Sequence, residues 1–371
     1  MPKKELHLRK KQYFCIAMKR IISETKAWFV AAITLMVTTT LQVHAQKLDW
    51  QIDSYGFFDN TEGDNSYRKD MTHFGFWVAP QLSVTSKNER HSVNASYAAL
   101  TEPGTKDIVS KGKPFLYYKY DNKDLRFIFG SFPRRMMKEQ MSDYIICDSV
   151  RYYKPEIGGF DFLYTNGNGH LEMFLDWIGL QQEDVREQFM VGLNTRFRHG
   201  ILQWGAEGYL YHYALRKVFD ENEFIHDYIT AHAYAGIEKE QVGILDKLDI
   251  RAGVLMAADR DRGDINRKWH LPVGFVADVY AQWKRLSLLQ TFYAGKRQQH
   301  FGNEAFGKYY LGETFTQSPW YSHTDINYEI MKDEQLSVKA GMKFNLTDGG
   351  LSFRQCLTLS YTIGGRLCSD K

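Results

Sequence analysis

The sequence contains little cysteine, and its cysteines do not suggest a disulfide framework. Only 4 of the 371 residues are cysteine, and Cys15 lies in a segment that we expect to be removed. The remaining Cys147, Cys356 and Cys368 are an odd set, which is not typical of disulfide-stapled exported proteins. The residue directly after the expected cleavage site is Gln46 and not cysteine, so we expect no lipoprotein anchor there.

Long hydrophobic runs are also missing. The longest apolar stretch, Ala27 to Leu41, has about 15 residues, whereas a membrane-spanning helix needs about 20. The mean hydropathy is negative, which excludes a bundle of membrane helices but remains compatible with strands that alternate apolar and polar residues. No Pro/Ser-rich linker or change in composition divides the chain, so we expect one domain.

Metal-binding motifs are absent. The sequence has no His-Glu-x-x-His and no Cys/His cluster, so it predicts no metal and no other cofactor. Two acidic loops could supply oxygens to calcium, but neither has the spacing of an EF-hand. These loops contain Asp59, Glu62 and Asp64 in one case and Asp259, Asp261 and Asp264 in the other.

The N-terminal region predicts export. Residues 18–45 contain a basic start, the apolar run and a small-residue cleavage site at Val43-His44-Ala45, as in a secretory signal. Residues 1–17 suggest a start codon assigned too early, with translation beginning at Met18. Removing residues 1–45 reduces 47 Lys/Arg to 39 and 44 Asp/Glu to 42, which changes a net charge of +3 to −3. The mature chain therefore lacks the positive charge of a nucleic-acid-binding protein.

What the sequence does contain is a side-chain period of two, which predicts strands. From Lys247 to Trp283, two such stretches are longer than the roughly 9–11 residues that cross a bilayer. About sixteen strands are expected, at 48–58, 71–86, 91–101, 113–121, 125–133, 158–165, 170–179, 187–197, 201–214, 228–239, 247–259, 269–283, 286–296, 320–330, 336–346 and 351–364.

Short and long connections alternate between these strands. Turns such as 166–169 and 198–200 follow even-numbered strands, and loops such as 60–70 and 134–157 follow odd-numbered ones. This pattern is typical of an up-and-down barrel, with tight periplasmic turns at one rim and long loops at the other. Two connections depart from this pattern, 240–246 as a long turn and 347–350 as a short loop. The strand count could therefore also be fourteen or eighteen.

The apolar register of each strand predicts the lipid-facing side. Phe74, Phe76 and Val78 share one register of the second strand, and the opposite register is polar. Tyr and Trp recur near strand ends, where amphipathic rings favour the lipid–water interface. The predicted aromatic girdles comprise Trp50, Tyr117, Tyr118, Tyr164, Trp177, Tyr209, Tyr211, Trp269, Trp283, Trp320, Tyr321 and Tyr361.

These features predict the fold class. In hydrocarbon an unpaired strand edge costs several kcal/mol per group, so the last strand must pair with the first. We expect an all-β protein, a transmembrane up-and-down antiparallel β-barrel of about sixteen strands at residues 46–371, located in the outer membrane of a Gram-negative cell.

Two short motifs carry a resemblance. The first strand Trp50-Gln-Ile-Asp-Ser-Tyr-Gly-Phe-Phe58 and the segment Leu125-Arg-Phe-Ile-Phe-Gly-Ser-Phe-Pro133 resemble porin-like outer-membrane barrels of Bacteroidota, which are distantly similar to phosphate-selective porins. The chain departs from them by lacking a terminal Phe. The resemblance implies a channel whose third long loop, residues 134–157, folds inward and narrows the pore.

Strand parity predicts a charged lumen. Positive residues gather near the seam of the barrel and negative ones opposite, which would create a transverse field that orients polar solutes. Alternatively, these charges pair with each other and fill a narrow lumen. The predicted lumen residues are Lys119, Arg126, Lys339, Lys343, Arg354, Asp161, Glu172, Asp176 and Glu207.

Arg134 and Arg135, at the start of the third long loop, are the candidates for a pore constriction. A loop of about 24 residues is unusual unless it has a function. The two arginines could instead contact lipopolysaccharide phosphates at the outer rim.

We expect passive diffusion of small polar or charged solutes, with no enzymatic activity and no nucleic-acid partner. Outer-membrane lipid and lipopolysaccharide are the expected surroundings, and a homotrimer remains open. The alternatives are a non-conducting barrel in secretion or surface assembly, a lipid hydrolase or a protease. For a hydrolase the candidates are scattered, namely Ser322 with His323, His212 near Glu207, and His232 on an inward register.

Overall fold

The computed structural model describes residues 47–218, 223–263 and 268–368. The predicted signal at 18–45 and the segment 1–17 lie outside this range. None of the described helices is long and apolar enough to span a membrane. The described strands are β1 (Lys47–Asn65), β2 (Met71–Thr85), β3 (His91–Thr101), β4 (Lys111–Asp121), β5 (Leu125–Pro133), β6 (Glu156–Asn166), β7 (Gly169–Gly179), β8 (Gln188–His199), β9 (Leu202–Tyr213), β10 (His226–Val242), β11 (Leu245–Asp261), β12 (Val273–Trp283), β13 (Leu286–Gly295), β14 (Trp320–Lys332), β15 (Leu336–Thr347) and β16 (Gly350–Cys368).

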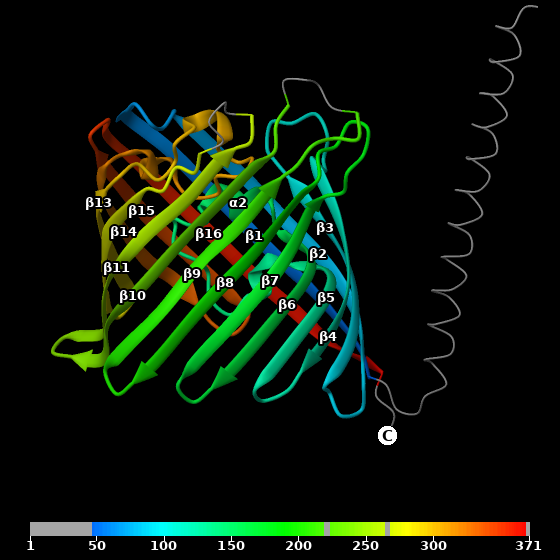
Figure 1. Cartoon of the computed structure of the whole chain (residues 1–371). Helices are drawn as coiled ribbons and strands as arrows, with labels where there is room; N and C mark the ends of the chain where they lie inside the picture. The colour runs from blue at the N-terminus through cyan, green and yellow to red at the C-terminus, as the bar shows by residue number, and fades with distance from the viewer. Residues whose placement is uncertain (1–46, 219–222, 264–267, 369–371) are drawn as a thin grey trace, which may run out of the picture.

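These strands form one closed antiparallel barrel in which each strand pairs with its neighbours in sequence (Figure 1). β16 closes the barrel on β1, with register partners from Leu48–Cys368 to Asn65–Gly350. The predictions of sixteen strands, of an up-and-down barrel and of the first-to-last pairing are therefore confirmed. Such a closed sheet leaves no strand edge unpaired in lipid.

Several strand boundaries differ from the prediction, in most cases because backbone pairing extends beyond the apolar register. β1 continues to Asn65, so most of the expected loop 60–70 is strand. β12 begins only at Val273 rather than at 269. The connection at 240–246 is a two-residue turn between β10 and β11, where Gly243 adopts a positive φ of 61° that favours glycine.

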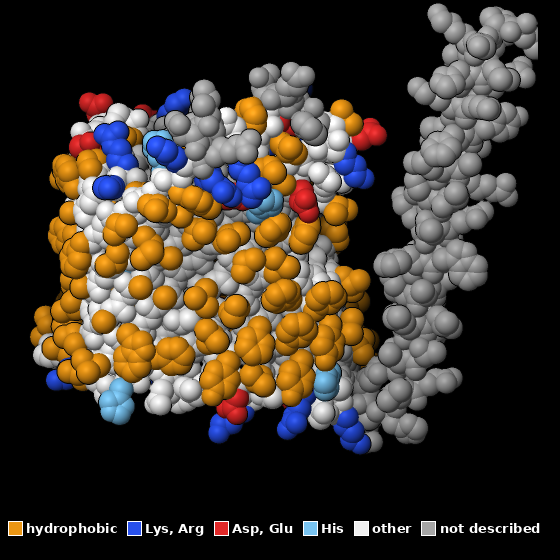
Figure 2. All heavy atoms as spheres, in the orientation of Figure 1, with side chains coloured by type: hydrophobic (Ala, Val, Ile, Leu, Met, Phe, Trp, Pro, Cys, Tyr) orange, Lys and Arg blue, Asp and Glu red, His pale blue; other side chains and the backbone are white. Residues whose placement is uncertain are grey.

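Apolar side chains cover the outer wall. Phe74, Phe76 and Leu82 on β2 are exposed on the outside, as their register predicts. Figure 2 shows a broad hydrophobic belt around the wall, with charged side chains gathered at its two edges. Trp177, Trp269 and Trp283 are exposed, as expected of aromatic girdles. The girdle prediction is wrong for four tyrosines, which point into the lumen and are buried, namely Tyr117, Tyr209, Tyr211 and Tyr321.

Two long loops fill part of the lumen. Residues 134–157 contain the 3-10 helix η1 (Arg134–Met136) and the short helix α2 (Asp148–Tyr153), and residues 296–319 contain η2 (Gly302–Ala305) and η3 (Thr314–Gln317). The loops bond to each other, because the Cys147 amide donates to the Leu311 carbonyl at 2.8 Å and the Glu313 amide donates to the Asp143 carbonyl at 2.9 Å. We call these two segments together the plug.

The plug occupies the half of the lumen nearer the long loops. Along the inner face of β16, Ser352 and Arg354 are buried, Thr358 is half-buried and Ser360 is exposed. On β15, Lys343 is buried and Lys339 is half-buried. Since long loops lie on the extracellular side of such barrels, the lumen beside these strands is closed toward the outside and open toward the periplasm.

The fold predicts that Val254 faces lipid near the middle of β11. Replacing it with Arg should lower the free energy of unfolding by about 2–4 kcal/mol, because a cation at the bilayer midplane is poorly solvated. Denaturant unfolding of the barrel in lipid vesicles measures this, with Val254→Ala as the control for lost volume. An unchanged free energy in Val254→Arg would mean that this position does not contact lipid.

Candidate functional site

The buried charges of the lumen form ion pairs rather than a positive side and a negative side. Arg126 donates to Asp161 at 2.9 Å and to Glu172 at 2.6 Å, all on the inner faces of β5 to β7. Arg134 pairs with Asp176. The alternative given with the prediction, in which the lumen charges pair with each other, describes these residues better than a transverse field does.

A second group of ion pairs fixes the plug to the barrel wall. The ammonium of Lys343 on β15 lies 2.6 Å from Asp143 and 2.7 Å from Asp148, both in the plug. Arg354 on β16 pairs with Asp59 on β1 and, at 2.6 Å, with Glu313 of the plug. These contacts join residues that lie far apart in the sequence, and burial strengthens them because little water screens the charges.

Three carboxylates of this group lie close enough together to be considered as a metal site. Asp143, Asp148 and Glu313 bring carboxylate oxygens within 4.8 Å of one another, but Lys343 and Arg354 already supply positive charge to all three. The chemistry of this cluster is therefore that of a structural ion-pair network. Asp59, which the sequence offered as a loop ligand for calcium, lies on β1 and also pairs with Arg354.

The remaining predicted lumen residues lie apart from these groups. Lys119 on β4 makes a 3.5 Å pair with Asp121, and Lys339 is half-buried on β15. Glu207 on β9 accepts a 2.8 Å hydrogen bond from the Ser142 amide of the plug and lies 3.4 Å from His232 Nδ1. Arg135 has a side chain that is 41% exposed and pairs with Asp53 on β1 at 2.5 Å.

Sequence reasoning missed a cluster on the outer surface of the barrel. His212 on β9 and Asp227 on β10 are register partners at the extracellular ends of their strands. Their chain neighbours Tyr211 and Tyr228 are buried in the lumen, so the alternation of a strand places His212 and Asp227 on the outside. We call His212, Asp227, Arg260 and Arg262 the rim cluster.

Asp227 connects the members of the rim cluster. It lies 2.8 Å from His212 Nδ1 and accepts hydrogen bonds from Arg260 at 2.7 Å and from Arg262 at 2.8 Å. An ionised carboxylate can only accept hydrogen bonds, so His212 carries a proton on Nδ1. The other ring nitrogen, Nε2, lies on the opposite edge of the imidazole and is the one that can accept a proton when the ring is neutral.

Aromatic rings border the rim cluster on both sides. The Phe189 ring lies 5.1 Å from that of His212 and stacks on Trp177, and Trp269 lies under the Arg260 guanidinium at 4.4 Å. Exposed Trp residues mark the depth of the lipid–water interface. Figure 2 shows Lys/Arg and His side chains together just above the hydrophobic belt on the face formed by β6 to β11.

The sequence offered Glu207 as the partner of His212, and this is wrong. The two positions differ by five residues on one strand, so they face opposite sides of the sheet. Parity alone could have excluded the pair. Finding Asp227 required the register between β9 and β10, which the sequence does not specify.

The plug should loosen in acid. Burial and the neighbouring Asp148 oppose ionisation of Asp143, but Lys343 and Arg151 hold the pKa of Asp143 at about 2, below its usual 3.8. A carboxyl whose pKa is lowered by folding stabilises the fold above its usual pKa, and this contribution is lost as pH falls through the folded value. Loop 134–157 should therefore resist pepsin at about pH 4 and be cleaved below about pH 2.

The control for this prediction is Asp143→Asn, which cannot ionise. Its loop should be cleaved at about pH 4 as well. A wild-type loop that is equally resistant at both pH values would contradict an anchor based on Asp143.

Comparison with solved structures gives outer-membrane barrels. The loop L8 deletion mutant of OmpT, an outer membrane protein of Vibrio cholerae, has a TM-score of 0.52 at 8% identity, with 86% of this chain and 100% of that chain covered. OprD of Pseudomonas aeruginosa has a TM-score of 0.48 at 9% identity, covering 86% and 94%. OccK1 (OpdK) of the same organism has a TM-score of 0.48 at 11% identity, covering 86% and 99%. At these identities the likeness concerns the fold alone. The outer-membrane location rests on the closed barrel and its apolar outer wall.

No curated protein matches the chain. A family model does, namely that of the lipid A 3'-O-deacylase type, over residues 40–368. This is a family of enzymes, so the expectation that the protein has no enzymatic activity is wrong. The match spans nearly all of the barrel, and the chain belongs to the lipid A 3'-O-deacylase-type family.

Proposed function

We propose that the protein hydrolyses an ester-linked acyl chain of lipid A in the outer leaflet, with His212 as the general base. The observation that carries this proposal is the position of the His212–Asp227 pair. It faces outward at the extracellular rim, at the depth where headgroups and the first part of the acyl chains of outer-leaflet lipids lie. The buried lumen histidine His232 has no such access to lipid.

The chemistry needs a base and a site for negative charge. Asp227 orients the imidazole through Nδ1, so Nε2 can take a proton from a water molecule. The resulting hydroxide adds to the ester carbonyl carbon and gives a tetrahedral oxyanion. As this intermediate collapses, the bond to the sugar oxygen breaks, and the proton returns from Nε2 to that oxygen. Water serves as the nucleophile because, among the described residues, no Ser, Thr or Cys side chain is hydrogen-bonded to His212.

Arg260 and Arg262 provide positive charge beside this base. A guanidinium has five N–H donors, so each arginine can bond Asp227 and still donate to another oxygen. The Arg262 side chain is 42% exposed and can reach a phosphate or the developing oxyanion of the substrate. Trp177 and Trp269 border the cluster and offer apolar surface for acyl chains.

Hydrolysis can be tested with purified folded barrel and lipid A in mixed micelles, by mass spectrometry of the released fatty acid. His212→Gln should reduce the rate by about 10²–10⁴-fold, which is the usual contribution of a general base. Asp227→Asn should also reduce it, because the imidazole loses its orienting partner.

The matched control is His199→Gln, which alters an exposed histidine at the periplasmic end of β8. It should retain the wild-type rate. If His212→Gln hydrolysed lipid A as fast as wild type, the rim cluster would not be the site.

Passage of small polar or charged solutes through the lumen is the second candidate. It is favoured by the half-exposed polar wall on the periplasmic side, which includes Lys339 and Thr358. Conduction would require the plug to move, since Arg354, Lys343 and their partners block the extracellular half.

Removing one buried partner of an ion pair costs about 3–5 kcal/mol, because the other charge stays buried. Lys343→Met should therefore loosen the plug and raise single-channel conductance in planar bilayers, from very low values in wild type. Lys339→Met should not. Equal conductance in all three proteins would exclude the plug as the barrier to solutes.

A further inference from the structure

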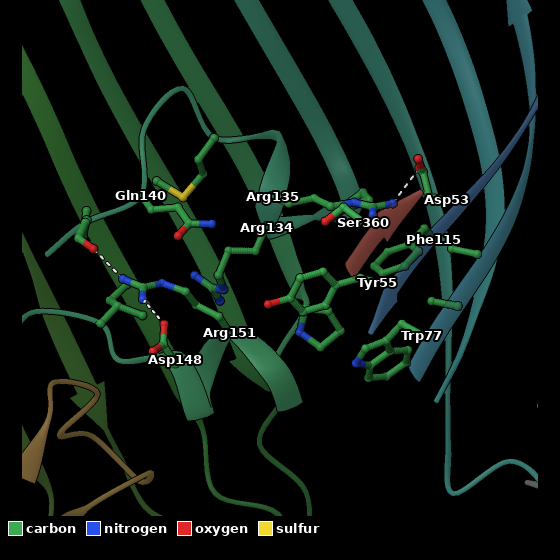
Figure 3. Close-up of a pocket in the computed structure, with 17 residues that line it drawn as sticks. Asp53, Tyr55, Trp77, Phe115, Arg134, Arg135, Gln140, Asp148, Arg151 and Ser360 are labelled. Atoms are coloured by element: carbon green, nitrogen blue, oxygen red, sulfur yellow. Dashed lines mark hydrogen bonds and ion pairs between the residues drawn. The ribbon is translucent and has the colours of Figure 1, made fainter. Parts of the chain in front are cut away.

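A cavity of about 230 Å³ lies inside the barrel between the plug and the inner face of β1 to β4. Its strand side is formed mainly by Tyr55, Trp77 and Phe115, and its plug side includes Met137 and Met141. Figure 3 shows these aromatic rings on one side and Arg134 with Arg151 on the other. A cavity of about 150 Å³ holds benzene, so by proportion this one holds roughly nine non-hydrogen atoms.

Arg134, which lines this cavity, has a hydrogen-bond donor without a partner. Its Nε donates to the Lys154 carbonyl at 3.1 Å, and its Nη2 donates to the Glu156 carbonyl at 3.0 Å and to Asp176. Its Nη1 is buried and has no partner among the described residues, although Arg134 lines the cavity and is only 8% exposed. Most buried polar groups in proteins are hydrogen-bonded, so this N–H calls for an acceptor.

The charge balance at the cavity decides what kind of acceptor fits. Arg134 is paired with Asp176, Arg135 with Asp53, and Arg151 with Asp143 and Asp148. Every arginine that lines the cavity is thus already neutralised. A carboxylate in this site of low dielectric constant would have no cation to compensate its charge, which is unfavourable. A neutral oxygen carries no such charge and avoids this cost.

We propose that this cavity binds a small neutral carbonyl compound, whose oxygen accepts a hydrogen bond from Arg134 Nη1 and whose apolar body packs against Trp77 and Phe115. The ligand enters from the periplasmic half of the lumen. On that side the exposed residues Ser360, Arg135 and Gln140 border the cavity, and the Arg135–Asp53 pair lies at its edge. This site is separate from the rim cluster, which lies on the outer surface.

The proposal can be tested by fluorine NMR on the full folded barrel in lipid nanodiscs, with empty nanodiscs as the background. The probes are 4-fluoroacetophenone, 4-fluorobenzoate and 4-fluorotoluene, which present a neutral acceptor, an anion and no acceptor. The ketone should bind saturably and at least about tenfold more tightly than either of the others. Binding of the benzoate as tight as that of the ketone, or no ketone signal above that of empty nanodiscs, would overturn the proposal.

Two variants separate the contribution of the Arg134 hydrogen bond from that of the cavity volume. Arg134→Lys keeps a cation for Asp176 but removes Nη1, and it should weaken ketone binding to the level of 4-fluorotoluene. Ala98→Phe should abolish binding of all probes, because Ala98 lines the cavity. Ala233→Phe on the lipid face is the matched control and should bind as wild type does. Ketone binding that survives Ala98→Phe would place the site elsewhere, even if Arg134→Lys fails to fold.

Discussion

The closure of the sheet on itself is the constraint on which the rest of the structure depends. In lipid every backbone N–H and C=O must find a partner within the protein, so β16 has to pair with β1. Closure then fixes the size of the interior. Barrels of about eight strands are filled by their own side chains, whereas sixteen strands leave a channel. The protein closes half of that channel with the segments 134–157 and 296–319.

Filling a polar lumen with loops creates a second requirement, because charges buried there must be compensated. Lys343, Arg354 and Arg126 each lie between carboxylates, and Arg134 pairs with Asp176. Such pairs add little to stability compared with apolar packing, but losing one partner is costly. They therefore specify where the plug sits rather than how strongly the barrel holds together.

This arrangement separates two chemical environments on one wall. On β10, Asp227 faces the outside and contributes to the rim cluster, while the next residue, Tyr228, is buried against Tyr310 of the plug. The outer face meets the lipids of the outer membrane. The inner face meets the plug and, further toward the periplasm, water.

Much of the fold could be predicted from the sequence, because a strand period of two and the parity of the loops are local signals. The approximate positions of the strands and their number followed from these signals. The closure by the last strand, expected at 351–364, followed from the need to pair every strand edge in lipid. The features that could not be predicted depend on contacts between residues that are far apart in the sequence. Tyr209 has the residue type of a girdle position, but its hydroxyl is hydrogen-bonded to Tyr309 and Leu311 of the plug. Nothing in the sequence places the plug there.

The candidate site shows the same limit. The sequence identified His212 as a candidate residue, but its partner Asp227 lies on another strand. The number of residues in the connecting loop does not fix the register between the two strands. The pairing of Lys343 with Asp143 joins segments 200 residues apart. Sequence spacing carries no information about such contacts, whereas burial and the need for charge compensation explain them once the fold is known.

The central claim is that the lumen is closed toward the outside and open toward the periplasm, so that the proposed lipid chemistry lies on the outer wall. Labelling of Ser360→Cys with a membrane-impermeant maleimide, after replacement of Cys147, Cys356 and Cys368, tests it most directly. The structure predicts no labelling when the reagent is added to intact cells and efficient labelling once it reaches the periplasm. Rapid labelling from outside in intact cells would contradict the account.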